Sequence, residues 1–426
     1  MKILTADHVL PITSEPINYG AIAIDATDIV AVGPFDDIKA QFDNAEVTEF
    51  GKAAILPGFV NCHSHLEITA MRGRLDEVEH DFRAWLLRLN DLRAAMSDKE
   101  IEEAAFLGAV EGREAGVTCF GDIGRSGHAG LRAMKRAGLR GIVFQETEFS
   151  PDNRTAEDDF KKLNAKFESL RGEATDLVTV GLSPHAPYTV GSMLFEMIAQ
   201  FSVINRVPIP IHGPEAANET AVMTRGRGLF TEVYARLGRE GVSPHCTTIE
   251  YLERLGVLSA RPLLAHCVEV TERDIERIAA NGARIAHCPK SNAKFGHGFA
   301  PFERFLDAGI AVGLGSDSVA SNNLCDILEE SRFASLVARN RPGSERFIGP
   351  GEMLRAATLG GAEALGLEDR IGSLEPGKKA DLAVISLDAA AQKPIGDTAA
   401  AVVFSSSGRD VVATYVNGEP IYSRRP

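Results

Sequence analysis

The sequence predicts an α/β fold: a (β/α)8 TIM-type barrel with a small β-sandwich domain built from both chain termini. Three observations support this prediction. Eight short apolar runs alternate with amphipathic segments through the middle of the chain, a pattern typical of a parallel barrel. Both ends of the chain instead contain closely spaced strand-like segments. Several of the apolar runs end in histidine, and catalytic groups of such barrels lie at the carboxyl ends of the strands.

The length and charge of the chain limit what it can be. A chain of 426 residues accommodates one large barrel and a smaller domain. We expect the sandwich to comprise residues 1–57 and 372–426, and the barrel residues 58–371. The net charge of −14 argues against nucleic acid or an anionic membrane as a partner. No stretch approaches the ~20 apolar residues that span a bilayer, and Asp7 and His8 interrupt any signal peptide, so a cytoplasmic location is expected.

The predicted sandwich draws its strands from both ends of the chain. In the first stretch the expected strands are 3–10, 20–24, 29–32 and 47–50. In the last stretch they are 380–385, 411–416 and 420–422. Asn417-Gly418, between two apolar runs, indicates a two-residue hairpin turn.

The predicted barrel follows from eight apolar runs and the helix signals between them. The expected strands are 59–65, 117–121, 142–146, 178–185, 208–212, 263–266, 283–287 and 311–317. Ser97 and Glu100 form a capping-box pattern, and Thr271 and Asp274 form a similar one. Asn281-Gly282 predicts the end of the second of these helices.

Polar residues at the expected strand ends predict a metal site. His63 and His65 end the first strand, His212 the fifth, His266 the sixth and Asp317 the eighth. Residues two apart on a strand point to the same side, so His63 and His65 can hold one ion together. Imidazole and carboxylate ligands suit zinc or another divalent transition metal, which generates hydroxide near neutral pH. The chain is therefore predicted to be a hydrolytic enzyme.

Other residues near these strand ends are candidates for further roles. Glu215, three residues after His212, can reach the same pocket and shuttle protons. His185 lies between Pro184 and Pro187, where a rigid loop could present it to a substrate. His287 could instead support the metal shell. Leu86 and Leu89 share a helical stripe with Phe82 and Trp85; the leucines suit the core, whereas the two aromatic rings could close over a flat heterocycle.

At this point the chain resembles the amidohydrolase superfamily, in its cyclic-amidine deaminase and chlorohydrolase branch. The resemblance runs nearly end to end, through the segments LPGFVNCHSHL (56–66), SPHAPY (183–188), HGPE (212–215), AHC (265–267), HCPKSN (287–292), GSD (315–317), SNN (321–323) and GSLEPGKKADL (372–382). It implies the barrel and composite sandwich predicted above. It also implies one divalent metal per subunit, usually zinc and sometimes iron, and family members often form homo-oligomers.

The resemblance also implies roles for individual residues. His63, His65, His212 and Asp317 correspond to the metal ligands. Asp317 also takes a proton during catalysis, Glu215 corresponds to the proton shuttle, and His266 corresponds to the group that orients the attacking water or the substrate. His185 and Ser321 correspond to residues that contact the substrate in adenosine-type deaminases.

The implied substrate is a small heterocycle, and the expected reaction is hydrolytic deamination of a 6-amino purine nucleoside derivative. Residues 65–73, followed by Phe82 and Trp85, resemble aminodeoxyfutalosine deaminases and also deaminases of methylthioadenosine and S-adenosylhomocysteine. Glu67 favours the first and could meet a polar substrate group. The alternative is a hydrolase of another heterocycle, such as guanine, a chlorotriazine or a cyclic amide. Many relatives have Leu-Ala where this chain has Gly213-Pro214, which weakens the transfer of a substrate. A non-catalytic scaffold with the same fold is a third hypothesis, which the complete ligand set disfavours.

Overall fold

Eight parallel strands form the barrel in the computed structural model, which describes residues 1–236, 238, 241, 243–344 and 346–424. They are β6 (Phe59–Ser64), β7 (Val117–Gly124), β8 (Arg140–Glu146), β9 (Val178–Ser183), β10 (Pro210–His212), β11 (Leu263–Ala265), β12 (Arg284–His287) and β13 (Val312–Leu314). The order is β6-β7-β8-β9 in one parallel sheet and β10-β11-β12-β13 in the other. Backbone hydrogen bonds from Leu182 to Pro208 (3.2 Å) and from Asp317 to His63 (3.0 Å) join the two sheets into a ring. The predicted barrel is therefore confirmed, each strand within a few residues of its expected position.

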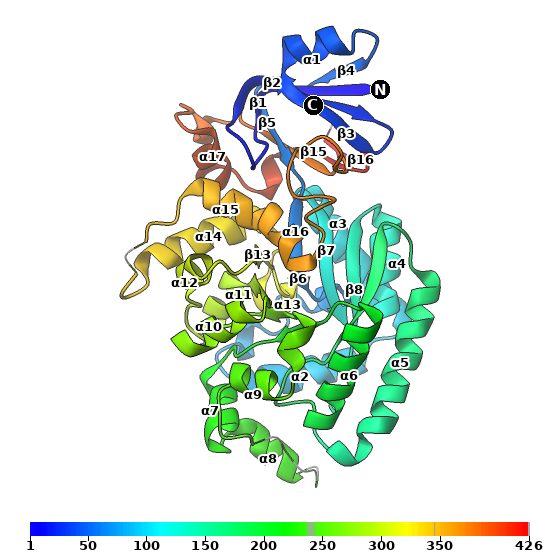
Figure 1. The fold of residues 1–426 in the computed structure, drawn as a ribbon, viewed down its shortest axis with the longest axis vertical. Helices are drawn as coiled ribbons and strands as arrows, with labels where there is room; N and C mark the ends of the chain where they lie inside the picture. Colours follow the sequence, from blue (N-terminus) through cyan, green and yellow to red (C-terminus); the bar gives the residue numbers. More distant parts are fainter. Residues whose placement is uncertain (237, 239–240, 242, 345, 425–426) are drawn as a thin grey trace.

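Helices surround the barrel strands (Figure 1). The longer ones are α2 (Phe82–Ala94), α3 (Asp98–Glu114), α4 (Gly127–Ala137), α5 (Ala156–Glu173), α6 (Ser192–Asn205), α7 (Ala217–Arg225), α8 (Leu229–Arg236), α10 (Glu272–Ala280), α14 (Ile327–Asn340) and α15 (Pro350–Ala357). The shorter ones are α9 (Thr248–Arg254), α11 (Pro289–Lys294), α12 (Phe302–Asp307), α13 (Val319–Asn322), α16 (Leu359–Leu365) and the 3₁₀-helices η1 (Leu66–Met71), η2 (Asp76–Val78), η3 (Asn153–Thr155) and η4 (Val257–Ala260). Both predicted capping boxes are present, at Ser97 before α3 and at Thr271 before α10.

The small domain contains strands from both ends of the chain, which lie together at the top of Figure 1. Its strands are β1 (Lys2–Val9), β2 (Ile17–Asp25), β3 (Asp28–Pro34), β4 (Glu46–Glu49), β5 (Ala53–Pro57), β14 (Leu382–Ser386), β15 (Val411–Val416) and β16 (Glu419–Ser423). Their order is β16-β15-β14-β5-β1-β2-β3, with β4 also pairing β1. The helices of this region are α1 (Phe35–Gln41), η5 (Ala390–Gln392), α17 (Thr398–Ala400), η6 (Ala401–Ser405) and η7 (Gly408–Asp410).

The hairpin predicted at Asn417-Gly418 joins β15 to β16, and both residues have positive φ (51° and 74°), as a two-residue turn of this kind requires. The sequence pattern did not predict α1 or β5. All five side chains of β5 are buried, so the alternation that marks a half-exposed strand is absent. The domain boundaries at 57/58 and 371/372 remain predictions.

A buried ion pair fixes the barrel to the small domain. Arg140 at the start of β8 donates from Nε to Oδ2 of Asp381 (2.7 Å) and from Nη2 to Oδ1 (3.2 Å). Its Nη2 also donates to Oδ1 of Asn417 (2.6 Å). Both members of the ion pair are almost inaccessible to solvent, so their charges depend on each other. No helix in the described part of the chain is long and apolar enough to cross a membrane.

Candidate active site

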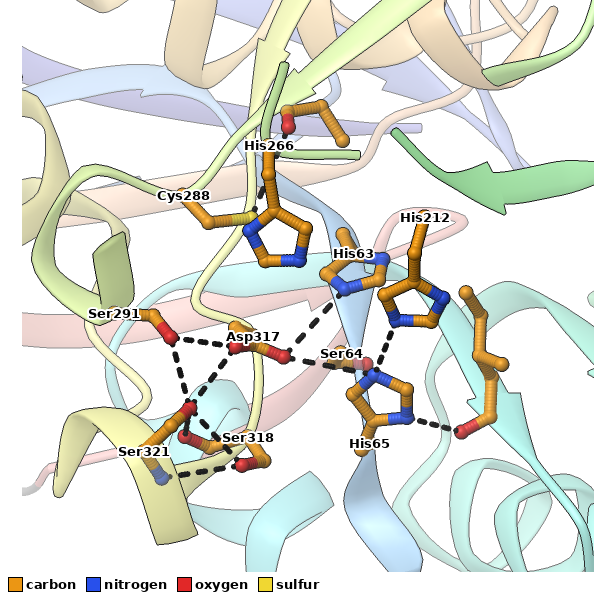
Figure 2. A network of polar contacts seen from close by, with 12 residues as sticks. His63, Ser64, His65, His212, His266, Cys288, Ser291, Asp317, Ser318 and Ser321 are labelled. Carbon is orange, nitrogen blue, oxygen red and sulfur yellow. Dashed lines mark hydrogen bonds and ion pairs between the residues drawn. The ribbon is translucent and has the colours of Figure 1, made fainter. Parts of the chain in front are cut away.

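The polar strand ends predicted from the sequence meet at one end of the barrel. Figure 2 shows His63 and His65 from the end of β6, His212 from β10, His266 after β11 and Asp317 after β13. Possible ligand atoms of His63, His65 and His212 lie within 4.8 Å of one another, and so do those of His63, His266 and Asp317. The structure therefore brings together all five residues that the strand pattern singled out.

Hydrogen bonds fix the orientation of two of these imidazoles. Nδ1 of His65 lies 3.0 Å from the carbonyl oxygen of Ile123, and Nδ1 of His212 lies 3.2 Å from that of His185. A carbonyl can only accept, so each Nδ1 carries a proton and each Nε2 points inward, where it offers a lone pair in the ligating form of the ring. The two Nε2 atoms lie 3.3 Å apart. Two lone pairs at this distance repel each other unless a cation lies beside both.

His63 and Asp317 complete this set of inward-facing acceptors. Neither ring nitrogen of His63 has a hydrogen-bond partner among the described residues, although the side chain is fully buried. Oδ1 of Asp317 lies 3.5 Å from Nε2 of His63 and 3.5 Å from Nε2 of His65. Burial lowers the pKa of His63 to about 4 and that of His65 to about 3, so both rings are neutral at pH 7. Three imidazoles and a carboxylate suit a divalent transition metal.

The second oxygen of Asp317 is held from the opposite side by two hydroxyl groups. Ser291 on α11 donates to Oδ2 at 2.6 Å, and Ser321 on α13 donates to the same atom at 2.9 Å (Figure 2). These bonds orient the carboxylate so that Oδ1 faces the histidines. Ser321, which the resemblance assigned to the substrate, therefore contacts Asp317 directly. The contact of Ser291 with Asp317 was not predicted from the sequence.

His266 lies beside this group with one face toward Glu215. Its Nδ1 donates to Oδ1 of Asn292 (2.9 Å), and its Nε2 lies 3.8 Å from Oε2 of Glu215. His266, Asp317 and His185 all have positive φ, at 66°, 54° and 47°. Such backbone conformations cost free energy in residues other than glycine and are concentrated at functional sites.

Glu215 lies in the loop between β10 and α7, buried between two imidazoles. Oε2 faces His266, and Oε1 lies 3.2 Å from Nδ1 of His297. Burial raises the pKa of Glu215, but these two histidines more than offset that effect and hold it at about 2. The backbone N–H of Glu215 donates to Oε2 of Glu219 (2.9 Å). Burial and the charge of Glu215 raise the pKa of Glu219 to about 8, so Glu219 is protonated at pH 7 while Glu215 is ionised.

Gly213-Pro214, which stands where many relatives have Leu-Ala, has a role in packing. A Cβ atom at Gly213 would lie 2.8 Å from the carbonyl oxygen of Ala265 and 2.8 Å from Sγ of Cys267. The carbonyl of Pro214 accepts hydrogen bonds from the backbone N–H groups of Val268 and Glu269. The segment before Glu215 is thus joined closely to the end of β11, which fixes the position of the carboxylate.

Phe82 and Trp85 lie on α2 in an aromatic cluster next to this carboxylate. Their rings stack at 6.1 Å, and both pack edge-on against Phe295. Trp85 is buried, and its indole N–H has no hydrogen-bond partner among the described residues. Leu86 and Leu89 pack against the same hydrophobic cluster, as predicted. The two aromatic residues therefore form part of a packed wall, in which the indole N–H is a free donor.

The remaining predicted substrate contacts have different surroundings. His185 is near His212, with ring centroids 4.8 Å apart, and its Nδ1 donates to Oγ1 of Thr189 (2.7 Å). Glu67 is buried and ion-paired with Arg93, and it accepts the backbone N–H groups of Arg125 (3.1 Å) and Ser126 (2.8 Å). Three donors within the protein therefore engage the Glu67 carboxylate.

His287 ends β12 and fits the strand-end pattern, but it is not part of the ligand cluster. It stacks on Phe302, with ring centroids 5.1 Å apart, and belongs to none of the converging ligand groups in the described part of the chain. His297 and Glu219 were missed altogether. Neither follows a strand, so the strand-end rule could not find them. The one available signal for His297 is a histidine between two glycines, in Gly296-His297-Gly298.

The chain is similar to known proteins in both sequence and fold. The model of the amidohydrolase family matches residues 54–421. A 5-methylthioadenosine/S-adenosylhomocysteine deaminase of Moorella thermoacetica is 32% identical, over 99% of this chain and 94% of that protein. An adenosine deaminase from Xanthomonas campestris with bound zinc superposes with a TM-score of 0.85 at 28% identity, over 98% of this chain and 92% of that one. An aminofutalosine deaminase of Helicobacter pylori has the same fold (TM-score 0.82, 21% identity, 99% and 100% covered).

Proposed function

The chain belongs to the amidohydrolase family, and from this premise we propose that it is a metal-dependent aminohydrolase. It removes the exocyclic amino group of a 6-amino purine nucleoside derivative and releases ammonia. One observation carries the proposal: an ionised carboxylate, Glu215, lies next to a cluster of three imidazoles and Asp317 whose free acceptor atoms face one another. The names of the relatives, which are deaminases of adenine nucleosides, support the same reaction.

The metal in this proposal is one divalent ion, zinc or iron, which His63, His65, His212 and Asp317 would hold. The facing lone pairs of His65 and His212, 3.3 Å apart, and the unpartnered nitrogens of His63 support this assignment. A bound ion would supply an acidified water, ready to act as hydroxide near neutral pH.

Three residues of the chain would move or orient the groups that react. Glu215, ionised at pH 7, accepts one proton of the attacking water and passes it to the ring nitrogen beside the amino-bearing carbon. Asp317 accepts the other proton and passes it to the amino group, which leaves as ammonia. His266 is anchored at Nδ1 by Asn292, so its Nε2 holds a fixed position from which it orients the water or the substrate.

The substrate within this class is narrowed by the relatives. The similarity to methylthioadenosine/S-adenosylhomocysteine deaminases favours those two nucleosides, whereas the sequence favoured aminodeoxyfutalosine because of Glu67. The buried ion pair of Glu67 with Arg93 weakens that preference, and Glu67 stays a proposed substrate contact. Phe82, Trp85, His185 and Ser321 stay proposed substrate contacts, with the free indole N–H of Trp85 as a donor for a heterocycle nitrogen.

A panel assay of the zinc-loaded protein tests the proposal. The panel contains adenosine, methylthioadenosine, S-adenosylhomocysteine, aminodeoxyfutalosine, guanine and a chlorotriazine, and ammonia is measured directly. We expect ammonia from at least one adenine nucleoside, with the thio-substituted nucleosides turned over fastest. Release of chloride, or ammonia from guanine alone, would instead identify a hydrolase of another heterocycle.

A further inference from the structure

His297 occupies a loop that brings it to the proposed proton shuttle from outside the barrel strands. The loop runs from the end of α11 to the start of α12, and glycines with positive φ flank the histidine (67° at Gly296 and 105° at Gly298). These conformations are readily adopted by glycine and rarely by other residues. The histidine side chain itself is 8% exposed. The two glycines therefore allow the loop to bury the side chain of His297.

Aromatic rings fix the plane of this imidazole. Phe295 stacks on it with ring centroids 5.1 Å apart and an angle of 20°, and Phe82 packs edge-on at 5.0 Å and 83°. In this orientation Nδ1 of His297 lies 3.2 Å from Oε1 of Glu215. This approach is a close polar contact without hydrogen-bond geometry, since Nδ1 has no hydrogen-bond partner among the described residues. The polar group beside this buried nitrogen is the Glu215 carboxylate.

We propose that His297 is a positioning residue for Glu215: it holds Oε1, which leaves Oε2, on the side of His266, as the oxygen that exchanges protons. This inference rests on the proposed function for its catalytic meaning, because Glu215 is a proton shuttle only if the chain is an aminohydrolase. The contact between His297 and Glu215 is independent of that assignment. If the residue only packed the loop, an apolar ring between Phe82 and Phe295 would be sufficient, and no nitrogen near Glu215 would be needed.

The charged and titratable groups around Glu215 explain why the contact matters. His266 faces Oε2 from the end of β11, and His297 faces Oε1 from the α11–α12 loop. Asp317 after β13 and Glu219 on α7 are nearby acids, and the Tyr188 hydroxyl lies close to Glu219. Burial and the neighbouring Asp317 both raise the pKa of Glu215, and only the two histidines among its main neighbours lower it. Without His297, only His266 would remain of the two histidines that lower the pKa of Glu215.

Three variants separate positioning from packing. His297→Phe keeps a ring in the aromatic slot and removes Nδ1, and His297→Asn keeps a donor near the place of Nδ1. Phe299→Ala changes a half-exposed residue of the same loop and leaves the contact with Glu215 intact. We expect His297→Phe to lower kcat by about tenfold to a hundredfold with little change in KM, because the polar contact that holds Oε1 of Glu215 is lost. His297→Asn should recover part of kcat, and Phe299→Ala should keep it.

Infrared difference spectroscopy gives a readout that does not require turnover. The spectrum of each protein minus the spectrum of its Glu215→Gln counterpart isolates the band of the Glu215 carboxyl group. We expect this carboxyl to become protonated at a pH about one unit or more higher in His297→Phe than in the wild type, because a favourable partner of the ionised form is gone. A protonation midpoint unchanged in His297→Phe would overturn the proposal. His297→Ala serves for the same measurement if the Phe variant does not fold.

The two proposals fail in different ways. A wild-type protein that releases no ammonia from any purine would contradict the proposed function, and the infrared midpoints would still decide whether His297 controls Glu215. Deaminase activity that is equal in the wild type and His297→Phe, with equal midpoints, would contradict the role of His297 alone.

Discussion

Replacing Glu215 with glutamine tests the proposed chemistry most directly. Glutamine has the shape of glutamate, so it can keep both neighbours: one polar atom facing His266, where the carboxylate oxygen lies 3.8 Å away, and one facing His297 at 3.2 Å. It cannot accept and return a proton. General acid–base catalysis by a positioned side chain contributes about 10²–10⁴-fold, which corresponds to roughly 2.7–5.4 kcal/mol in activation free energy. We expect kcat to fall by that factor.

The metal content of the same variant provides the control. Glu215 lies outside the sets of His, Cys, Asp and Glu ligand atoms that converge in the described part of the chain, so Glu215→Gln should bind as much zinc as the wild type. Elemental analysis and the rate of ammonia release would be measured on one preparation. Retention of more than a tenth of the wild-type kcat, with full metal content, would refute the proton-shuttle role. Loss of metal together with activity would show that Glu215 also supports the site.

Three further predictions concern the metal, the domain contact and pH. A chelator should abolish ammonia release, and added zinc should restore it. His65→Ala should lower the zinc content measured by elemental analysis, whereas a variant of the partly exposed His128 should not. Equal zinc contents in the two variants would contradict the ligand assignment. Arg140→Met should lower the free energy of unfolding by roughly 3–5 kcal/mol in urea titrations, because Asp381 is left as a buried charge. The double variant Arg140→Met/Asp381→Leu should regain much of this free energy. An equal loss of stability in the single and double variants would refute the explanation. Burial raises the pKa of Glu330 to about 8, so the folded state keeps a proton that the unfolded state loses above about pH 4.3. The resulting stability is present at low pH and is lost as the pH rises to about 8. Glu330→Gln should therefore flatten the fall in unfolding free energy between pH 6 and 8, whereas parallel curves for the two proteins would contradict the raised pKa.

The predicted barrel and the predicted strand-end cluster depended on information that is local in the chain. His63 and His65 are two residues apart, and a strand turns such neighbours to the same side. The parallel order of the strands then brings the end of β6 next to the end of β13, which is why Asp317 could be grouped with the histidines before any contact was known. Glu215 was found for the same reason, since it follows His212 by three residues.

Residues held by distant partners could not be assigned from local pattern. Glu67 follows His65 and looked available to a substrate, but Arg93 on α2 pairs with it. Ser291 appeared only as part of a resemblance, and its hydrogen bond to Asp317 connects residues from different βα units. Arg140 looked like an ordinary residue before a strand, and only the folded chain pairs it with Asp381, 241 positions later.

The sequence by itself determined the fold class, the positions of the barrel strands and the identity of the residues at their ends, because strand periodicity and the chemistry of side chains are properties of short segments. The tertiary structure alone decided which nitrogen of each imidazole faces inward, which oxygen of Asp317 is free, and that His297 meets Glu215. These features depend on hydrogen bonds and ring contacts between segments far apart in the chain, whose distances no local pattern contains.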